Sequence, residues 1–184
     1  MKELSLNILD ITENSVKAKS TLTEISIEET EETLKITISD NGYGMSEETV
    51  KSVSDPFYTT RTTRSVGLGI PLLKMSAEQT GGSVSIKSVL DKGDGSFHGT
   101  TVTATFYKNH IDFTPLGDIV STITTLIQGH PDTDFLFIHN KEEKNVRLDT
   151  REIRLILGSD IPLNEYEIIK WIEGELNEQY SAFN

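Results

Sequence analysis

The chain has 184 residues, of which 35% are hydrophobic and 25% are charged, and this balance is typical of a soluble globular protein with one domain and at most a smaller appendage. Its formal net charge of −12 argues against binding to nucleic acid or to an anionic membrane surface. The lack of cysteine excludes disulfides, thiolate metal sites and a cysteine nucleophile, and the lack of an export signal or a long apolar run predicts a cytoplasmic protein.

The first 108 residues show a regular succession of helical and alternating apolar patterns. The predicted elements are a helix over 3–17, strands over 22–28 and 33–39, a helix over 69–79, and strands over 83–89 and 99–107. Residues 46–66 are polar, contain one proline and lack sustained periodicity, so we expect no regular element there. This order predicts an α+β fold, a two-layer α/β sandwich with helices on one face of a mixed sheet.

The pattern changes after Lys108. The predicted elements are a helix over 115–127 that begins at Pro115, a strand pair over 135–139 and 145–148, and helices over 150–157 and 164–180, the last capped by Asn164. Residues 1–108 carry 15 acidic and 11 basic side chains, a net −4, whereas residues 109–184 carry 14 and 6, a net −8. We therefore expect one domain over 1–108 and a small acidic α+β appendage of unknown role over 109–184.

Two polar side chains of the first helix are placed for chemistry. Asp10 and Asn14 are four residues apart, so they share one helix face. A carboxylate and an amide oxygen on one face suit a hard cation such as Mg²⁺, held directly or through water.

Three glycine-containing motifs follow in the chain. Asp40-Asn-Gly42-Tyr-Gly44 comes directly after a strand, where a carboxylate can accept a hydrogen bond from an exocyclic amine. The motif Gly67-Leu68-Gly69 opens a helix, whose free backbone N–H groups can hold phosphate oxygens. The third motif, residues 99–101, begins a strand. Each motif alone is weak, but the ordered set is specific.

The ordered set resembles the motifs of the GHKL superfamily, which includes gyrase, mismatch-repair ATPases, heat-shock chaperones and histidine kinases. Residues 10–18 resemble its asparagine box, and residues 40–44 and 67–69 resemble its two glycine boxes. The segment Asp55-Pro-Phe57-Tyr-Thr-Thr-Arg61 is similar to the Glu-Pro-Phe-Tyr/Phe-Thr-Thr-Lys segment of histidine kinases. The resemblance covers about residues 4–107 and favours the histidine-kinase branch.

The resemblance implies a Bergerat-type ATP-binding fold with ATP and Mg²⁺ as ligands. It implies that Asn14 holds Mg²⁺, and that Asp40 binds the adenine amine with Thr101 beside it. Gly42 and Gly44 belong to the same adenine-binding loop.

The resemblance also implies a lid and a phosphate site. Residues 46–66 would close over the nucleotide, with Phe57 as the anchor of this lid and Arg61 reaching toward the triphosphate. Gly67, Leu68 and Gly69 would meet the phosphates at the start of the second helix.

Two departures from the family pattern bear on activity. Histidine kinases carry a dimerising hairpin with a phospho-accepting histidine before this domain, and we expect that hairpin to be absent here. Hydrolytic members place glutamate where this chain has Asp10, whose shorter side chain predicts slow hydrolysis. His110 stands five residues before Pro115, the spacing of a phospho-acceptor box, but we interpret this segment as a turn that enters a helix.

These features favour an Mg-ATP-binding regulatory protein that modulates a partner protein. The alternatives are a protein kinase that acts in trans on a histidine, serine or threonine of another protein, and a slow ATPase that uses Asp10 as its base. A scaffold with a decayed pocket is disfavoured because all the motifs are intact. The stand-alone layout is similar to that of small ATP-binding proteins of anaerobic bacteria, some of which accompany hydrogenase components, so such a component is one candidate partner.

Overall fold

The computed structural model describes residues 3–54, 68–158 and 160–183. Its elements are α1 (Leu4–Lys17), β1 (Leu22–Glu29), β2 (Thr33–Asp40), α2 (Glu47–Ser54), α3 (Gly69–Gln79), β3 (Ser83–Val89), β4 (Gly99–Tyr107), α4 (Ile119–Gly129), β5 (Asp134–Lys141), β6 (Lys144–Asp149), α5 (Thr150–Leu157) and α6 (Tyr166–Phe183).

The strands form one mixed sheet in the order β3-β4-β2-β1-β5-β6. The pair β1 and β5 is parallel, and the other four neighbouring pairs are antiparallel. Alternation along β2 places Leu34, Ile36, Ile38 and Asp40 on the same buried face, so the carboxylate of Asp40 ends an apolar row. Strand β2 thereby carries one ionisable side chain into the helix layer.

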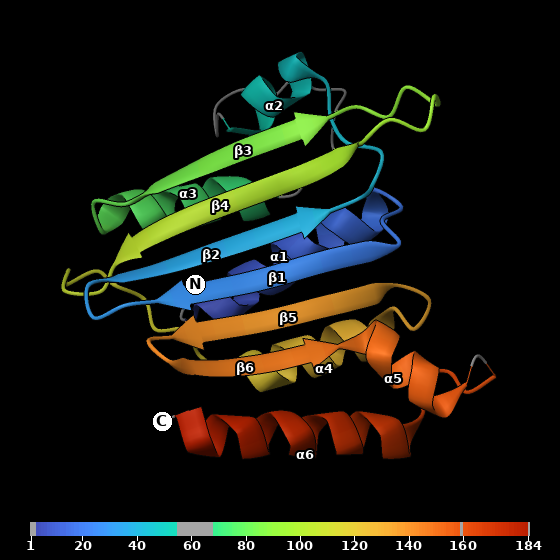
Figure 1. Ribbon diagram of the computed structural model, residues 1–184. Helices are drawn as coiled ribbons and strands as arrows, with labels where there is room; N and C mark the ends of the chain where they lie inside the picture. Colours follow the sequence, from blue (N-terminus) through green and yellow to red (C-terminus); the bar gives the residue numbers. More distant parts are fainter. Residues whose placement is uncertain (1–2, 55–67, 159, 184) are drawn as a thin grey trace.

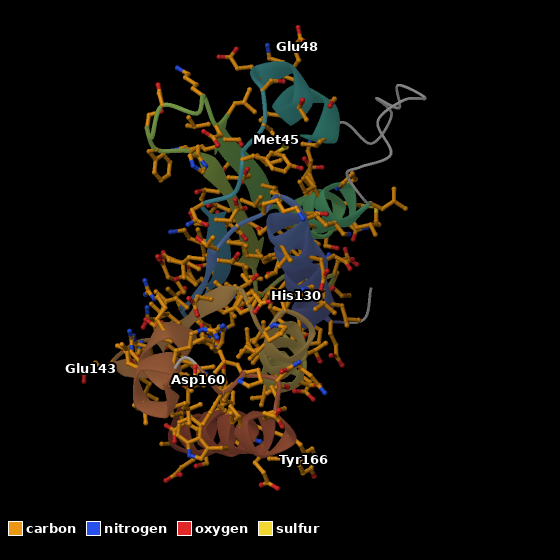
Figure 2. The ribbon with its side chains drawn as sticks, turned by 90° about the vertical axis from the view of Figure 1, so that its right-hand side faces the viewer. Met45, Glu48, His130, Glu143, Asp160 and Tyr166 are labelled. Carbon is orange, nitrogen blue, oxygen red and sulfur yellow. The ribbon has the colours of Figure 1, made fainter. Side chains whose placement is uncertain are left out.

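Helices α1, α3 and α4 lie on one face of this sheet, behind it in the view of Figure 1. Helix α1 packs on α3 and on α4, so it lies in the middle of the layer. Figure 2 shows the same layering from the side, and α6 runs along the outer edge of the sheet beside β6. The buried apolar side chains of both parts of the chain form one cluster between the layers.

The expected α+β sandwich is confirmed, and the elements expected in the first 108 residues are present. Helix α2 is an addition, because residues 46–66 were expected to lack regular structure. Its start has a physical cause, since the Ser46 hydroxyl accepts a hydrogen bond from the Thr49 backbone N–H at 3.2 Å and two glutamates follow in the first turn.

Two helix starts expected in the second part are wrong. Helix α4 begins at Ile119 and not at Pro115, because the Asp118 carboxylate accepts from the Ser121 N–H at 2.9 Å and caps the helix there. Helix α6 begins at Tyr166, and its first turn forms at the Glu165 carbonyl, so Asn164 is not the cap.

Residues 109–184 join the first part through the sheet. Strand β5 runs beside β1 over its whole length, from the pair Leu22 and Asp134 to the pair Glu29 and Lys141. Helix α4 packs on α1 and is followed by His130, which is labelled in Figure 2. The His130 imidazole lies 2.7 Å from the Glu13 carboxylate of α1. The small α+β unit expected after residue 108 therefore extends the sheet and the helix layer of the first part.

Within the described residues, no helix is long and apolar enough to cross a membrane.

Candidate functional site

Asp40 is the central polar group of the site. It ends β2 and is only 8% exposed. Its Oδ2 accepts a hydrogen bond from the Ser15 hydroxyl at 2.7 Å, and its Oδ1 accepts from the backbone N–H groups of Gly42 at 2.9 Å and Thr100 at 3.3 Å. These donors, from α1, the loop after β2 and β4, fix the orientation of the buried carboxylate.

The carboxylate of Asp40 retains capacity for a ligand. An ionised carboxylate offers about four lone-pair positions, and the described residues supply three donors. One acceptor position is therefore left for a donor from a bound molecule. Because an ionised carboxylate can only accept, a ligand at this position would have to carry an N–H or O–H.

A pocket opens beside Asp40 between α1, the sheet and the start of α3. Its polar lining comes from Asn14, Ser15, Lys17, Asp40 and Thr100. Its apolar lining comes from Ile11, Ala18, Ile38, Met45, Ile70 and Val102, with Tyr43 and Gly44 at the loop. Apolar walls with a few convergent polar groups are typical of sites for small molecules and cofactors.

The loop of residues 41–45 is held tightly at the mouth of this pocket. Gly44 has φ +69°, and a Cβ at this position would lie 2.0 Å from the Val89 carbonyl oxygen. The Tyr43 carbonyl accepts from the Asp91 N–H at 2.8 Å, and the Met45 N–H donates to the Ser88 hydroxyl at 2.8 Å. The glycine thus permits the loop to approach the end of β3, which positions Tyr43 and Met45 on the pocket.

The same loop is packed against the end of α1. A Cβ at Gly42 would lie 2.6 Å from the Ala18 carbonyl oxygen, and the Tyr43 N–H donates to that oxygen at 2.9 Å. On the other side of the loop, the His98 Nδ1 lies 2.6 Å from the Gly42 carbonyl oxygen. These contacts of the loop, together with the Ser15 hydrogen bond, set the position of Asp40 relative to α1.

The two polar residues expected on one face of α1 occupy different surroundings. Asn14 is half-buried and lines the pocket, whereas Asp10 is exposed and does not line it. A Cβ built on Gly69 would lie 3.1 Å from the Asp10 Cβ, so the first residue of α3 is beside Asp10. One side of the site is therefore formed by Asn14 at the pocket, with Asp10 and the start of α3 next to it.

The structure corrects the expected neighbour of Asp40 by one residue. Thr100, not Thr101, is the register partner of Asp40 in the β2–β4 pair, and Thr100 lines the pocket. The Thr101 hydroxyl lies 2.8 Å from the Ser39 hydroxyl, on the opposite face of the sheet. A shift of one residue along a strand exchanges the two faces.

Three expected site residues, Phe57, Arg61 and Gly67, lie outside the described residues. Leu68 immediately precedes α3, is 73% exposed, and is absent from the pocket lining. The N–H groups in the first turn of α3 have no partner within the helix, as at any helix start. Ile70, in that same turn, lines the pocket beside Asp40.

The oxygen donors at the site fit a magnesium ion only together with a ligand. Among the described residues no group of three or more histidine or acidic side chains is placed to hold a metal. Asn14 lines the pocket wall, and its amide group could offer one oxygen. Mg²⁺ is commonly held by one or two protein groups together with phosphate oxygens and water, so this donor set suits a metal that arrives with a nucleotide.

Sequence reasoning missed Ser15, Lys17 and Thr100. Ser15 directly follows Asn14, and its burial could have been recognised because it falls on the same helix face as Ile8 and Ile11. Thr100 could have been found from the alternation of β4, since it shares a face with Val102 and Ala104.

The chain is similar to known proteins over its first part, which holds the pocket around Asp40. Residues 2–110 match the family described as histidine kinase-, DNA gyrase B- and HSP90-like ATPase. The chain is 30% identical over 95 residues to sporulation kinase C of Bacillus subtilis (strain 168), which is 50% of this chain and 21% of that protein. It is 29% identical over 89 residues to the sensor histidine kinase ZraS of Salmonella typhimurium, 47% of this chain and 19% of that protein. The chain spans about a fifth of the length of these relatives.

Two solved structures share the fold at 16% sequence identity. The N-terminal domain of a DNA repair protein has a TM-score of 0.58 and covers 86% of this chain and 58% of that chain. The Aquifex aeolicus MutL ATPase domain complexed with ADP has a TM-score of 0.53 and covers 85% of this chain and 69% of that chain. Each solved structure covers a larger fraction of this chain than residues 2–110 make up. The likeness in fold therefore continues into the part of the chain after residue 108.

Proposed function

Because the chain belongs to the family of histidine kinase-, DNA gyrase B- and HSP90-like ATPases, we propose that it binds ATP with Mg²⁺ in the pocket around Asp40. We further propose that it works as a regulatory protein, in which nucleotide binding modulates a partner protein. The carrying observation is the buried Asp40 carboxylate, which has three donors and one acceptor position left at the wall of an apolar pocket.

Adenine fits this proposal by its chemistry. Its exocyclic amine donates to the open position on Asp40, and its flat ring lies between the apolar side chains of the pocket, among them Met45 and Val102. A hydrogen bond to a charged group contributes about 1.5–3 kcal/mol. Asp40 is thus proposed to select the base.

The phosphates would extend along α1 toward the start of α3. The free N–H groups of that helix end attract anions. Asp10 lies close to Gly69 and would repel the phosphates, so a cation between them is required. Mg²⁺ held by Asn14 and the phosphate oxygens would meet this requirement.

Calorimetric titration with Mg²⁺ and a non-hydrolysable ATP analogue tests the pocket. The native chain is expected to bind the analogue, and Asp40→Asn is expected to weaken binding by about 10- to 150-fold, which corresponds to the loss of about 1.5–3 kcal/mol. Thr101→Ala is the matched control, because its hydroxyl contacts Ser39 on the far face of the sheet and its loss should leave binding unchanged.

The native chain failing to bind the analogue would refute the proposed pocket. Loss of binding in Thr101→Ala equal to that in Asp40→Asn would mean that the substitutions act through the sheet and not through the base. Nucleotide-dependent protection of the chain from proteolysis would test the regulatory part of the proposal, since a module that signals nucleotide binding must change its exposed surface when it binds.

A second candidate is a protein kinase that acts in trans on a histidine, serine or threonine of another protein. What favours it is that relatives of the chain are named as a sporulation kinase and a sensor histidine kinase. Transfer of labelled γ-phosphate to a co-expressed protein would support it, and label that never leaves ATP would count against it. A hydrogenase component is one substrate or partner to include, because the sequence resemblance suggests it.

Slow hydrolysis by Asp10 is the third candidate. Its supporting observation is that Asp10 lies one helical turn from Asn14 and beside Gly69, near the proposed phosphate position. Asp10→Asn should then abolish hydrolysis while binding remains. An unchanged rate of phosphate release in this variant would exclude Asp10 as the base.

A further inference from the structure

A buried polar cluster lies further along the strands from Asp40, since Asp40 pairs with Thr23 of β1 and the centre of the cluster pairs with Ile27. At its centre is His139 of β5, which is 2% exposed. The His139 Nδ1 lies 2.8 Å from the Tyr180 hydroxyl of α6, and its Nε2 lies 3.3 Å from Glu29 Oε2 at the end of β1. The cluster therefore connects the last helix of the chain to the edge region of the sheet.

The hydrogen bonds assign one neutral tautomer to His139. The Glu29 carboxylate can only accept, so the proton lies on Nε2. Burial raises the pKa of the Tyr180 phenol, with the negative charge of Glu29 acting in the same direction, so this hydroxyl remains a donor. Nδ1 is then the acceptor for Tyr180, and both ring nitrogens are satisfied while the imidazole is neutral.

The negative charge of Glu29 is already paired with two lysines, so it would stabilise a positively charged imidazole only weakly. Its Oε1 accepts from the Lys108 ammonium at 2.6 Å, and the Lys141 ammonium lies 3.7 Å from the same oxygen. Burial alone would raise the pKa of Glu29, but the Lys108 hydrogen bond and the nearby positive charges lower it overall, so the carboxylate is ionised. Its single negative charge is already shared by two cations.

Helix α6 is attached to the sheet around this cluster. The rings of Tyr180 and Phe183 contact the His139 ring at centroid distances of 5.8 and 4.5 Å. The Lys144 ammonium donates to the Phe183 carbonyl at 3.0 Å. Gln179 covers the free edge of β6, since its side chain accepts from the Arg147 N–H at 2.8 Å and donates to the Arg147 carbonyl at 3.2 Å.

We propose that α6 is a latch on the edge of the sheet that stays closed while His139 is neutral and opens when His139 takes up a proton. A proton on Nδ1 would point at the Tyr180 hydroxyl, which would have to turn its own hydrogen away from the ring. The new charge would lie in a buried position beside Lys108 and Lys141. Opening of α6 relieves both costs, because water then reaches the imidazole.

The charged and titratable groups around His139 act in opposing directions. Burial lowers the pKa of His139 most, Glu29 of β1 raises it, and Lys141 of β5 and Lys108 beyond β4 lower it further. From α6 the facing titratable group is Tyr180, and from the N-terminus of α4 it is Asp118, which lines the cavity next to His139. The net result is a pKa below the ordinary value of 6.5.

The closed form of α6 is expected to lose stability as the pH falls. With α6 closed, His139 binds its proton only below its lowered pKa, whereas with α6 open it binds near 6.5. The closed form is therefore fully favoured above pH 6.5, and it weakens as the pH falls from 6.5 toward the lowered pKa. Glu29 stays ionised through this range, because its own pKa is lowered from 4.5.

Hydrogen exchange of the α6 amides tests the latch on the full chain. Exchange rates between pH 7.5 and 5.0, each divided by the intrinsic rate at that pH, give the opening constant of α6 relative to that of β2. We expect this constant to rise up to about tenfold per pH unit below 6.5, the slope of one linked proton. The amides of β2 should show no such rise.

His139→Gln removes the titration, while its amide can still donate to Glu29 and accept from Tyr180. The opening constant of this variant should be independent of pH in the same range. His110→Gln is the matched control, since His110 is an exposed histidine and its replacement should leave the slope intact. If His139→Gln opens α6 at every pH, the native imidazole is titrated by NMR, and its midpoint must lie below 6.5, at the pH where the rise of the opening constant levels off.

Three results would overturn the proposal. The first is an α6 opening constant that does not change with pH in the native chain, or a His139 midpoint without any change in α6. The second is a slope that survives in His139→Gln. The third is protection of α6 that increases at low pH, which would mean that the imidazolium is stabilised by the faces of the Tyr180 and Phe183 rings.

Discussion

Replacement of Gly44 by alanine tests how much stability depends on the close contact between the pocket loop and the end of β3. The backbone of Gly44 is left-handed, with φ +69°, and an added Cβ would lie 2.0 Å from the Val89 carbonyl oxygen. Ordinary van der Waals contact begins at 3.4 Å, so the loop must retreat by about 1.4 Å, the difference between these two distances.

The expected cost has two parts. The left-handed conformation costs alanine about 1–2 kcal/mol. A retreat of that size would break the hydrogen bonds from Asp91 N–H to the Tyr43 carbonyl and from Met45 N–H to Ser88, each worth about 1 kcal/mol. We therefore expect Gly44→Ala to lower the free energy of unfolding by about 3–4 kcal/mol, and to weaken nucleotide binding.

Gly93→Ala is the matched control, because Gly93 has nearly the same φ, +70°, and nothing within 4 Å of its Cβ position. It should cost only the conformational part, about 1–2 kcal/mol. Urea unfolding followed by circular dichroism measures both variants. Equal destabilisation of the two would refute the reasoning, since it would show that the loop yields to Val89 without loss.

Three other substitutions test separate contacts. Ser15→Ala removes one donor from the buried Asp40 carboxylate, and we expect the free energy of unfolding to fall by about 1.5–3 kcal/mol in urea unfolding, because a hydrogen bond to a charged group contributes about that much to stability. Gln179→Ala uncovers the edge of β6 and should lower stability by about 1 kcal/mol, with faster exchange of amides in β6 but not in β4. The hydrogen bond from Arg151 holds the pKa of Asp149 below its ordinary value of 3.8, so native stability should fall as the pH drops from 3.8 through that lowered pKa. Asp149→Asn should flatten this part of the acid unfolding curve, and an unchanged curve would contradict the assignment.

Local patterns in the sequence were sufficient for most of the fold. The alternating runs of β1, β2 and β4 predicted strands because one face of each is buried, and α3 was predicted because glycines bracket an apolar helical run. Helix α2 was missed because its apolar face is short. A helix-start signal was nevertheless present in the sequence, because a serine is followed there by two glutamates.

The errors lie where local pattern competes with tertiary contact. Proline at position 115 suggested a helix start, but the Pro115 carbonyl accepts a hydrogen bond from the Leu4 N–H. The helix begins only after Asp118, which caps it. Thr101 was taken from the family resemblance, whereas the alternation of β4 with Val102 and Ala104 places Thr100 on the buried face, where it pairs with Asp40. The union of β1 with β5 joins residues more than a hundred positions apart, and no short pattern predicts such a pair.

The parallel pairing of β1 with β5 sets an order for synthesis of the chain. Leu22 cannot meet its partner Asp134 until 112 further residues have been added, the difference between their positions. At about 5–20 residues per second, β1 remains an unpaired edge for about 6–22 seconds after it leaves the ribosome. During that interval its isoleucines, buried in the final sheet, border an open row of N–H and C=O groups that other nascent chains could pair with. A chain that ends at residue 108 would keep this edge permanently, so loss of solubility on truncation would reflect the missing β5 and not the missing pocket.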